Sequence, residues 1–194
     1  MRKIPLGLLF LPGVVLAAPL KVDGSIAAGA LVGRIAYDGP QADGSGHLHL
    51  GDTVVGEALT LGGSVGSEIA EGVALGLGLD ATYQNGLRGR LGFTSYDSAV
   101  ELDATADLTV TRRGVVWRAG AGISAALWNA SQAAIAAPDN VASLDMVRGP
   151  VAKVSVSWPF AAHVGVACEA RSAYLVRNDL SYMATTAVLA LSFR

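Results

Sequence analysis

The chain has 194 residues, a length that suits one domain, and it is 52% hydrophobic with only 15% charged residues. Its 14 lysines and arginines stand against 16 aspartates and glutamates, and the formal net charge of −2 argues against nucleic acid as a partner. The only cysteine, Cys168, cannot form an internal disulfide, so an exported chain of this kind is stabilised by something other than cross-links.

The chain begins with MRKIPLGLLFLPGVVLAAP, which has the features of a secretory signal peptide. Two basic residues come first, the apolar run 4–16 follows, and small residues end the segment. Val15 and Ala17 occupy positions −3 and −1 of a cleavage site after Ala17. A transmembrane anchor is the alternative, but the run is short and is interrupted at Pro5, Gly7 and Pro12. We expect residues 1–17 to be a signal peptide and residues 18–194 to form the mature domain.

Apolar and polar residues alternate with period two in many stretches of the remaining chain. Such alternation predicts β-strands with one apolar and one polar face. No mature stretch has about 18 consecutive apolar residues, which excludes helical membrane spans. We expect eight strands, at about 24–37, 53–66, 72–83, 99–111, 115–127, 150–158, 163–175 and 183–193.

The expected connections alternate between long and short. The long ones lie at about 38–52, 84–98, 128–146 and 176–182, and the short ones at about 67–71, 112–113 and 159–162. This alternation predicts an up-and-down meander with both chain ends at the short-turn end, as in transmembrane barrels.

Aromatic residues gather at both ends of the expected strands. Beside the short turns or the C-terminus are Trp117, Trp158, Phe160 and Phe193. Beside the long loops are Tyr37, Tyr83, Trp128, Tyr174 and Tyr182. Two aromatic girdles around an apolar band are typical of a membrane barrel, although aromatics also cap the ends of soluble sheets.

The stretch VELDATADLTVTRRGVVWRAGAGISAAL, residues 100–127, decides which face should point inward. Its polar positions mix charges with glycine, for example Arg118 beside Gly120 and Gly122. Glycine would weaken a water-exposed strand, whereas inside an eight-stranded barrel small residues leave room for charged side chains. We therefore expect the polar face inside and the apolar face against lipid.

The apolar faces also set an expected register for two hairpins. Matching apolar to apolar in 99–111 and 115–127 requires paired residue numbers that sum to 225, which places Asp107 opposite Arg118. The turn would then be the four residues 111–114 with a left-handed glycine, or the two residues 112–113.

In the second hairpin, a sum of 322 places Lys153 opposite Glu169, while a sum of 320 also keeps the faces aligned. Buried charges must be paired, so we expect the polar faces to form a charge cluster that fills and braces the lumen. Its expected members are Asp80, Glu101, Asp103, Asp107, Arg118, Lys153, Glu169 and Arg171.

With its signal peptide and eight alternating strands, the chain resembles small eight-stranded bacterial outer-membrane proteins of the OmpA-transmembrane and OmpX type. The resemblance covers about residues 20–194 as architecture. Its most specific element is the C-terminal strand TTAVLALSF, which ends on Phe193 and looks like the family's signal to the barrel-assembly machinery. This chain departs from the pattern by adding Arg194. The segment GPVAKVSVSWPF also resembles a penultimate hairpin of such barrels.

The resemblance implies an all-β fold, an eight-stranded antiparallel up-and-down transmembrane β-barrel over residues 18–194, in the bacterial outer membrane. It implies outer-membrane lipid and lipopolysaccharide as partners. It implies no particular function, because barrels of this kind have many.

Few residues suggest a specific site. His47 and His49 alternate near Asp52, but no third ligand is close, which favours solvated loop histidines over a metal site. Arg88 and Arg90, in NGLRGRLG, are candidates for contact with lipopolysaccharide phosphates, with a solvated loop as the alternative.

We therefore expect a non-enzymatic outer-membrane barrel with a closed polar lumen, without cofactor or metal, which braces the membrane or presents surface loops. One alternative is a soluble periplasmic barrel of the lipocalin kind, with the apolar stripes inward around an apolar ligand. A narrow pore and a lipid-active enzyme are further alternatives.

Overall fold

The computed structural model describes residues 20–40, 46–90, 93–130, 145–177 and 180–193. The expected signal peptide and Arg194 lie outside these ranges. Eight strands are present: β1 Leu20–Pro40, β2 His47–Ala70, β3 Val73–Arg90, β4 Phe93–Arg112, β5 Val115–Ala130, β6 Asp145–Pro159, β7 Val164–Arg177 and β8 Leu180–Phe193. In the described ranges, no helix is long and apolar enough to cross a membrane.

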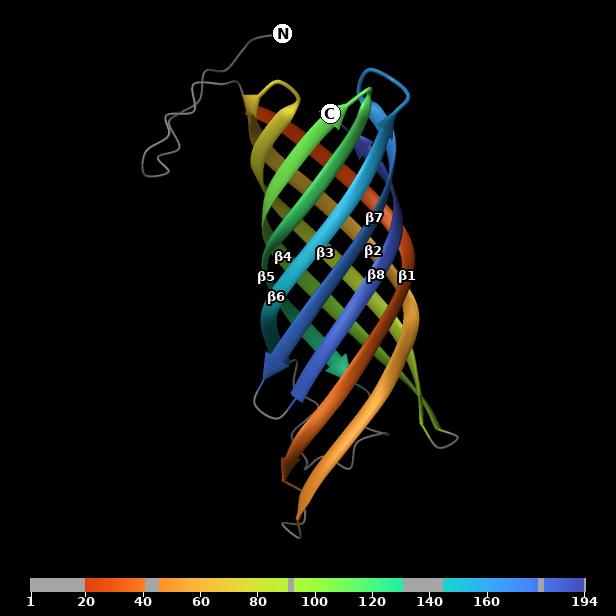
Figure 1. The fold of residues 1–194 in the computed structure, drawn as a ribbon. Coiled ribbons are helices and arrows are strands. Elements are labelled where there is room, and N and C mark those ends of the chain that lie inside the picture. Colours follow the sequence, from red (N-terminus) through yellow and green to blue (C-terminus); the bar gives the residue numbers. More distant parts are fainter. Residues whose placement is uncertain (1–19, 41–45, 91–92, 131–144, 178–179, 194) are drawn as a thin grey trace, which may run out of the picture.

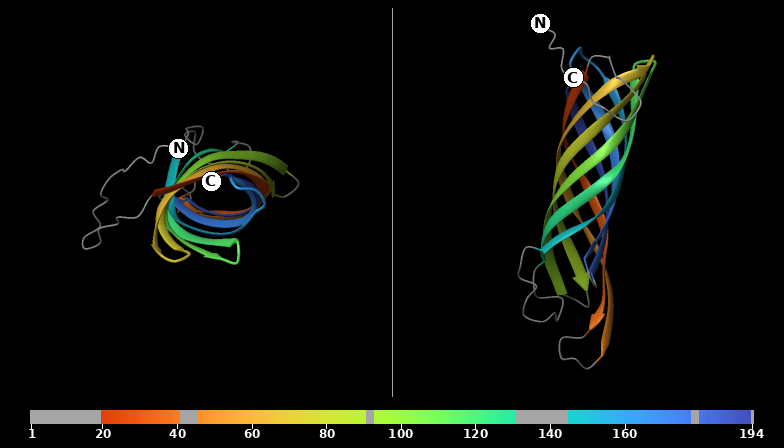
Figure 2. Two further views of the ribbon diagram at one scale, coloured as in Figure 1. Left: turned by 90° about the horizontal axis from the view of Figure 1, so that it is seen from above. Right: turned by 90° about the vertical axis from the view of Figure 1, so that its left-hand side faces the viewer.

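The strands form one closed antiparallel barrel in which each strand pairs with its neighbours in sequence and β8 pairs with β1. Figure 2 shows the closed ring in its left view, and Figure 1 shows the start of β1 and the end of β8 at the end of the barrel that has the short turns. Following paired residues around the ring from Ile26 leads back to β1 at Ala36, a stagger of ten residues. The eight-stranded meander expected from the sequence is confirmed.

Each strand is longer than the alternation indicated, mainly at the loop end. The largest difference is in the β1–β2 hairpin, which stays paired as far as Pro40 and His47 and extends beyond the other strands (Figure 1). The segment 38–52 was expected to be a loop, and this expectation is wrong for residues 38–40 and 47–52, which belong to β1 and β2. Antiparallel pairing is made by the backbone, so it continues there past the stretch in which the side chains alternate.

The apolar face of the strands points outward. Leu79 is 68% exposed and Ile123 is 72% exposed, whereas Glu101 is fully buried inside the barrel. From Val73 to Tyr83, the outward face covers about the 9–11 residues that a tilted strand needs to cross a bilayer. A lipocalin-like barrel would need these stripes to point inward, and the structure has the opposite arrangement.

Aromatic side chains mark both borders of this apolar surface. At the turn end Trp117, Trp158, Phe160 and Phe193 are exposed, and at the loop end Tyr83 and Tyr174 are exposed. Tyr182 does not belong to the outer girdle. It is buried in the lumen, where its hydroxyl donates to Oε1 of Gln84 at 2.9 Å. The side chains of Tyr37 and Trp128 lie outside the described residues.

The β4–β5 register differs from the expected one by two residues. Thr109 faces Arg118, and Asp107 faces Gly120. Arg112 pairs with Val115, so the turn is Arg113–Gly114, with φ of 51° and 78°. Two positive φ values are what a type I′ hairpin requires, and this turn matches the twist of the flanking strands. The expected Asp107–Arg118 pair is therefore wrong, although the left-handed conformation of Gly114 was expected.

The β6–β7 register is also two residues away from the expected one. Lys153 faces Arg171, and Glu169 faces Ser155. The expected Lys153–Glu169 pair is wrong because the two bases take their partners from across the lumen rather than from the neighbouring strand. The β4–β5 and β6–β7 registers are each shifted by an even number of residues, so every side chain keeps the face that the alternation assigned to it.

Candidate functional site in the barrel lumen

In the middle of the lumen, acidic residues of β3 and β4 lie across from basic residues of β6 and β7. Asp80 on β3 lies directly beside Asp103 on β4, and Lys153 on β6 lies directly beside Arg171 on β7. Like charges in adjacent positions would destabilise a sheet. Here each wall supplies the counter-charge of the other, so ion pairs cross the barrel interior.

Arg171 is the centre of the larger ion-pair group. Its Nη2 lies 2.5 Å from Oε1 of Glu101 and 2.7 Å from Oδ1 of Asp103, and its Nε also donates to Asp103. Glu101 further accepts hydrogen bonds from Ser124 Oγ at 2.7 Å and from the side-chain amide of Gln84. This network satisfies two buried carboxylates with one bidentate guanidinium, the geometry that makes arginine effective in a dry interior.

Lys153 forms a smaller group that is less complete. Its Nζ lies 2.6 Å from Oδ2 of Asp80 and 3.5 Å from Oδ2 of Asp107. The second contact is an ion pair by distance but is too long to be a good hydrogen bond. Within the described part of the chain, the two carboxylate oxygens of Asp107 have no hydrogen-bond partner, and the hydroxyl of Thr105 has none either.

Glycines make room for these charges. A Cβ placed on Gly78 would lie 2.6 Å from Oδ2 of Asp107 and 2.8 Å from Nζ of Lys153. A Cβ on Gly120 would overlap the other oxygen of Asp107, and one on Gly62 would overlap Asp80. The glycines that the sequence places on the polar faces therefore stand where charged side chains fill the lumen.

Arg118 and Glu169 lie closer to the turn end and are only partly buried. Arg118 donates to Oδ2 of Asp23 at 2.9 Å. Glu169 lines a recess of about 40 Å³ together with Arg118 and Lys153. Asp23 was not among the expected lumen charges because it comes just before the first expected strand, 24–37.

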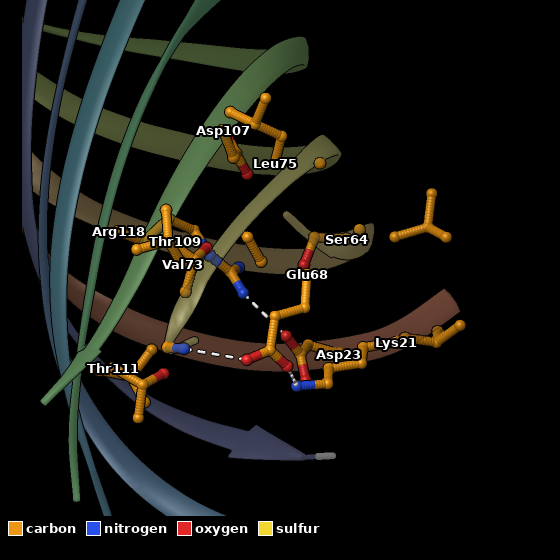
Figure 3. A pocket seen from close by; sticks show the side chains of 17 residues that line it. Lys21, Asp23, Ser64, Glu68, Val73, Leu75, Asp107, Thr109, Thr111 and Arg118 are labelled. Atoms are coloured by element: carbon orange, nitrogen blue, oxygen red, sulfur yellow. Dashed lines mark hydrogen bonds and ion pairs between the residues drawn. The ribbon is translucent and has the colours of Figure 1, made fainter. Parts of the chain in front are cut away.

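A larger pocket of about 500 Å³ opens at the turn end (Figure 3). At its rim, Lys21 donates to Glu68 at 2.8 Å, and the backbone N–H of Gly72 donates to the same carboxylate at 2.9 Å. These hydrogen bonds hold the pKa of Glu68 below its usual value. Figure 3 places Asp107 at the opposite end of the pocket from Lys21 and Glu68.

An apolar layer fills the lumen on the loop side of the charges. Its largest members are Leu31, Val54, Val147, Leu175 and Tyr182. Leu31 and Leu175 are 2% and 0% exposed. The layer was not expected, yet the sequence carries a signal for it, since apolar neighbours such as Leu175 and Val176 put apolar side chains on both faces of a strand.

The other candidate residues lie near the loop end. His47 and His49 are in β2, Asp52 follows in the same strand, and Arg88 and Arg90 are near the end of β3. The backbone of Arg88 pairs with Val54 and that of Arg90 with Phe93, while all five candidate side chains lie outside the described residues. Within the described part of the chain, no group of three acidic, histidine or cysteine side chains could hold a metal ion.

No protein-family model matches the chain, and no curated protein matches it. Three solved structures that match are all outer-membrane barrels. Neisserial surface protein A is 13% identical, with 86% of this chain and 95% of that one covered, at a TM-score of 0.50. Outer membrane protein OprG from Pseudomonas aeruginosa is 12% identical, with 88% and 94% covered, also at 0.50. The outer membrane enzyme PagL is 13% identical, with 84% and 97% covered, at 0.45. The chain therefore has the closed eight-stranded barrel fold of small outer-membrane proteins.

Proposed function

We propose that this chain is a non-enzymatic outer-membrane protein, exported by its signal peptide, whose closed barrel braces the membrane or presents its loops at the surface. The observation that carries the proposal is the reversed polarity of the barrel, with leucines outside and ion pairs inside. In water such a molecule would expose a continuous apolar belt, which soluble monomers rarely do. In a bilayer the same belt is solvated by lipid, and closure leaves no strand edge unpaired.

The closed lumen supports a structural role over that of a pore. The ion-pair groups of Arg171 and Lys153 fill the middle of the barrel, and the layer around Leu31 and Leu175 fills its loop side. Eight-stranded barrels have an interior just wide enough for side chains. Two filled layers in series leave no room for a continuous water path.

The chemistry of the lumen supports a non-enzymatic role. Glu101 and Asp103 are engaged by Arg171, and Asp80 is engaged by Lys153, so these carboxylates brace the walls. Among the described histidine side chains, His163 is exposed at the β6–β7 turn, whereas Glu101 and Asp103 are buried in the lumen. A hydrolytic site of the serine or histidine kind needs a base within hydrogen-bond reach of its nucleophile.

Two partners belong to this proposal. Lipopolysaccharide phosphates would contact Arg88 and Arg90, which lie near the loop end of β3. The barrel-assembly machinery would recognise β8, whose outward residues alternate up to Phe193. In outer-membrane barrels the long loops face the exterior, and both assignments agree with this orientation, because β1 begins and β8 ends at the short-turn end.

Cell fractionation tests the proposal. We expect the protein in outer-membrane fractions, with a gel mobility that changes on boiling because the closed barrel resists detergent until heated. A cysteine introduced into the segment 131–144 should react with a membrane-impermeant thiol reagent added to intact cells. The same protein carries Cys168→Ser, so that the native thiol gives no background signal. Recovery of the protein as a soluble monomer that needs no detergent would contradict the membrane location.

A further inference from the structure

The β4–β5 turn holds an arginine where the backbone favours other residues. Arg113 has a φ of 51°, and within the described part of the chain it is the one non-glycine residue with a positive φ. The adjacent β2–β3 turn has its positive φ at Gly72, a residue that adopts this conformation without strain. Residues that keep such a disfavoured conformation are frequent at functional sites. The arginine at position 113 therefore points to a function for its charge.

Arg113 and its neighbour Arg112 are two unpaired bases at the turn end of the barrel. Both side chains are exposed, and neither forms a hydrogen bond or an ion pair with the described residues. Lys21 and Arg118, which lie at the same end, each pair with an acid, at 2.8 and 2.9 Å. Two adjacent guanidinium groups repel each other, so an anion from outside the chain would stabilise them.

The strand that leads into the turn places the charge of Arg112 at the border of the apolar surface. Leu108 and Val110 point outward from β4, and Arg112 takes the next outward position. Val110 pairs with Trp117, an exposed member of the aromatic border at the turn end. Tryptophan rings of such a border lie at the level of the lipid headgroups. Arg112 is therefore within reach of lipid phosphates.

We propose that Arg112 and Arg113 bind the phosphate of an anionic phospholipid of the phosphatidylglycerol kind, in the leaflet on the turn side of the barrel. Guanidinium groups bind phosphate oxygens through paired hydrogen bonds. A zwitterionic headgroup fits less well, because the two arginines would repel its ammonium group. A soluble anion also fits less well, because a lipid phosphate is already held beside Trp117 and loses less freedom on binding.

The site rests on the membrane location proposed above, which refolding into phosphatidylcholine vesicles tests by itself. The binding test compares phosphatidylglycerol with phosphatidylcholine, each brominated on its acyl chains so that it quenches nearby tryptophans. Trp117 and Trp158 are native reporters at the turn end, and Trp128→Phe removes the tryptophan near the other end. At low salt the relative binding constant should favour phosphatidylglycerol by about fivefold or more. The preference should fall in high salt, because exposed charges are screened.

Two variants locate the site. Arg113→Asn removes a charge and puts a preferred residue in the turn, so a weaker preference in this variant cannot come from misfolding. Arg112→Gln removes the neighbouring charge, and its stability in phosphatidylcholine vesicles should be unchanged because the site is empty there. Each variant should lower the preference about fivefold. Arg148→Gln is the matched control, since Arg148 is an exposed arginine of the outward face near the loop end of β6 and should leave the preference unchanged.

Three results would overturn the site. They are equal quenching by the two lipids in the wild-type protein, an unchanged preference in Arg112→Gln and Arg113→Asn, and an equal loss in Arg148→Gln. Inorganic phosphate that displaces phosphatidylglycerol more strongly than chloride does at the same ionic strength would assign the arginines to a soluble anion and overturn the lipid. If the protein refolds into vesicles but shows no lipid preference, the membrane location stands and this site alone is refuted.

Discussion

At the scale of single residues, the barrel interior depends on a few bases that each serve more than one acid. Arg171 holds Glu101 and Asp103, which are 0% and 3% exposed. Such a group is weak evidence for extra stability, because desolvation offsets much of the attraction. Breaking the group is nevertheless costly, because removal of the arginine leaves two carboxylates buried without a cation.

Arg171→Ala should therefore destabilise the barrel by on the order of 3–5 kcal/mol, the usual cost of a broken buried ion pair. Urea unfolding in lipid vesicles measures this difference. Arg112→Ala is the matched control, because Arg112 is exposed at the β4–β5 turn and its loss should change stability by less than about 0.5 kcal/mol. Equal effects of the two substitutions would mean that the lumen pairs contribute nothing specific.

At the scale of elements, the faces of the strands could be predicted from the sequence and their registers could not. The face depends on the alternation within one strand, as in Leu102 and Asp103, and needs no knowledge of a neighbour. The register was argued by matching the apolar faces of adjacent strands, which placed Asp107 opposite Arg118. The observed register is shifted by two residues, and an even shift keeps the faces aligned, so this rule could not tell the two registers apart.

The candidate site was predictable to a similar extent. Charged residues on polar faces could be assigned to the lumen, but their partners could not, because Arg171 and Asp103 are 68 residues apart and meet only through barrel closure. Asp23 and the inward Tyr182 were missed for a local reason. Both lie at strand ends, where the alternation no longer separates an inward position from a rim position.

The β4–β5 hairpin allows a test of register at its turn. Arg113 has a φ of 51°, a conformation that costs most non-glycine residues roughly 1–2 kcal/mol but that asparagine tolerates. Arg113→Asn should therefore stabilise the barrel by on the order of 1 kcal/mol, since Asn-Gly is the preferred pair for this turn. The shift in the urea midpoint reports the gain.

Arg112→Asn is the control for this turn. Arg112 is paired in the sheet opposite Val115, and asparagine is a poor strand former, so this change should stabilise nothing. A gain at residue 112 and none at residue 113 would place the turn one residue earlier and would contradict the observed register.

At the scale of the whole molecule, the barrel consists of three interior zones stacked along its axis. The turn end is an open pocket with charged residues at its rim, the middle is an ionic layer, and the loop side is an apolar layer around Leu31 and Leu175. The outer surface is uniform by comparison, with an apolar belt between aromatic borders. We therefore expect solutes to enter the lumen from one end without passing through it.

Planar bilayer recordings should accordingly show no steady open channel from the purified protein. The ionic and apolar layers would both have to be displaced for ions to pass, and each is packed to low exposure at residues such as Glu101 and Leu175. Leu175→Ala should remain closed as well, because the ionic layer is intact in that variant. Reproducible conductance of the wild-type protein, altered by Asp107→Ala, would show that the lumen is a pore.

The placement of acids on one wall and bases on the other has a consequence for how the barrel assembles. Lys153 and Asp80 are 73 residues apart, and neither finds its counter-ion within its own hairpin. A partly formed sheet thus carries unneutralised charge on one face, which disfavours its burial in lipid before the sheet curls. The ion pairs join β3 and β4 to β6 and β7, so they form only once the sheet has curled far enough to bring these strands across from one another. We expect this coupling between neutralisation and curling to disfavour half-inserted intermediates.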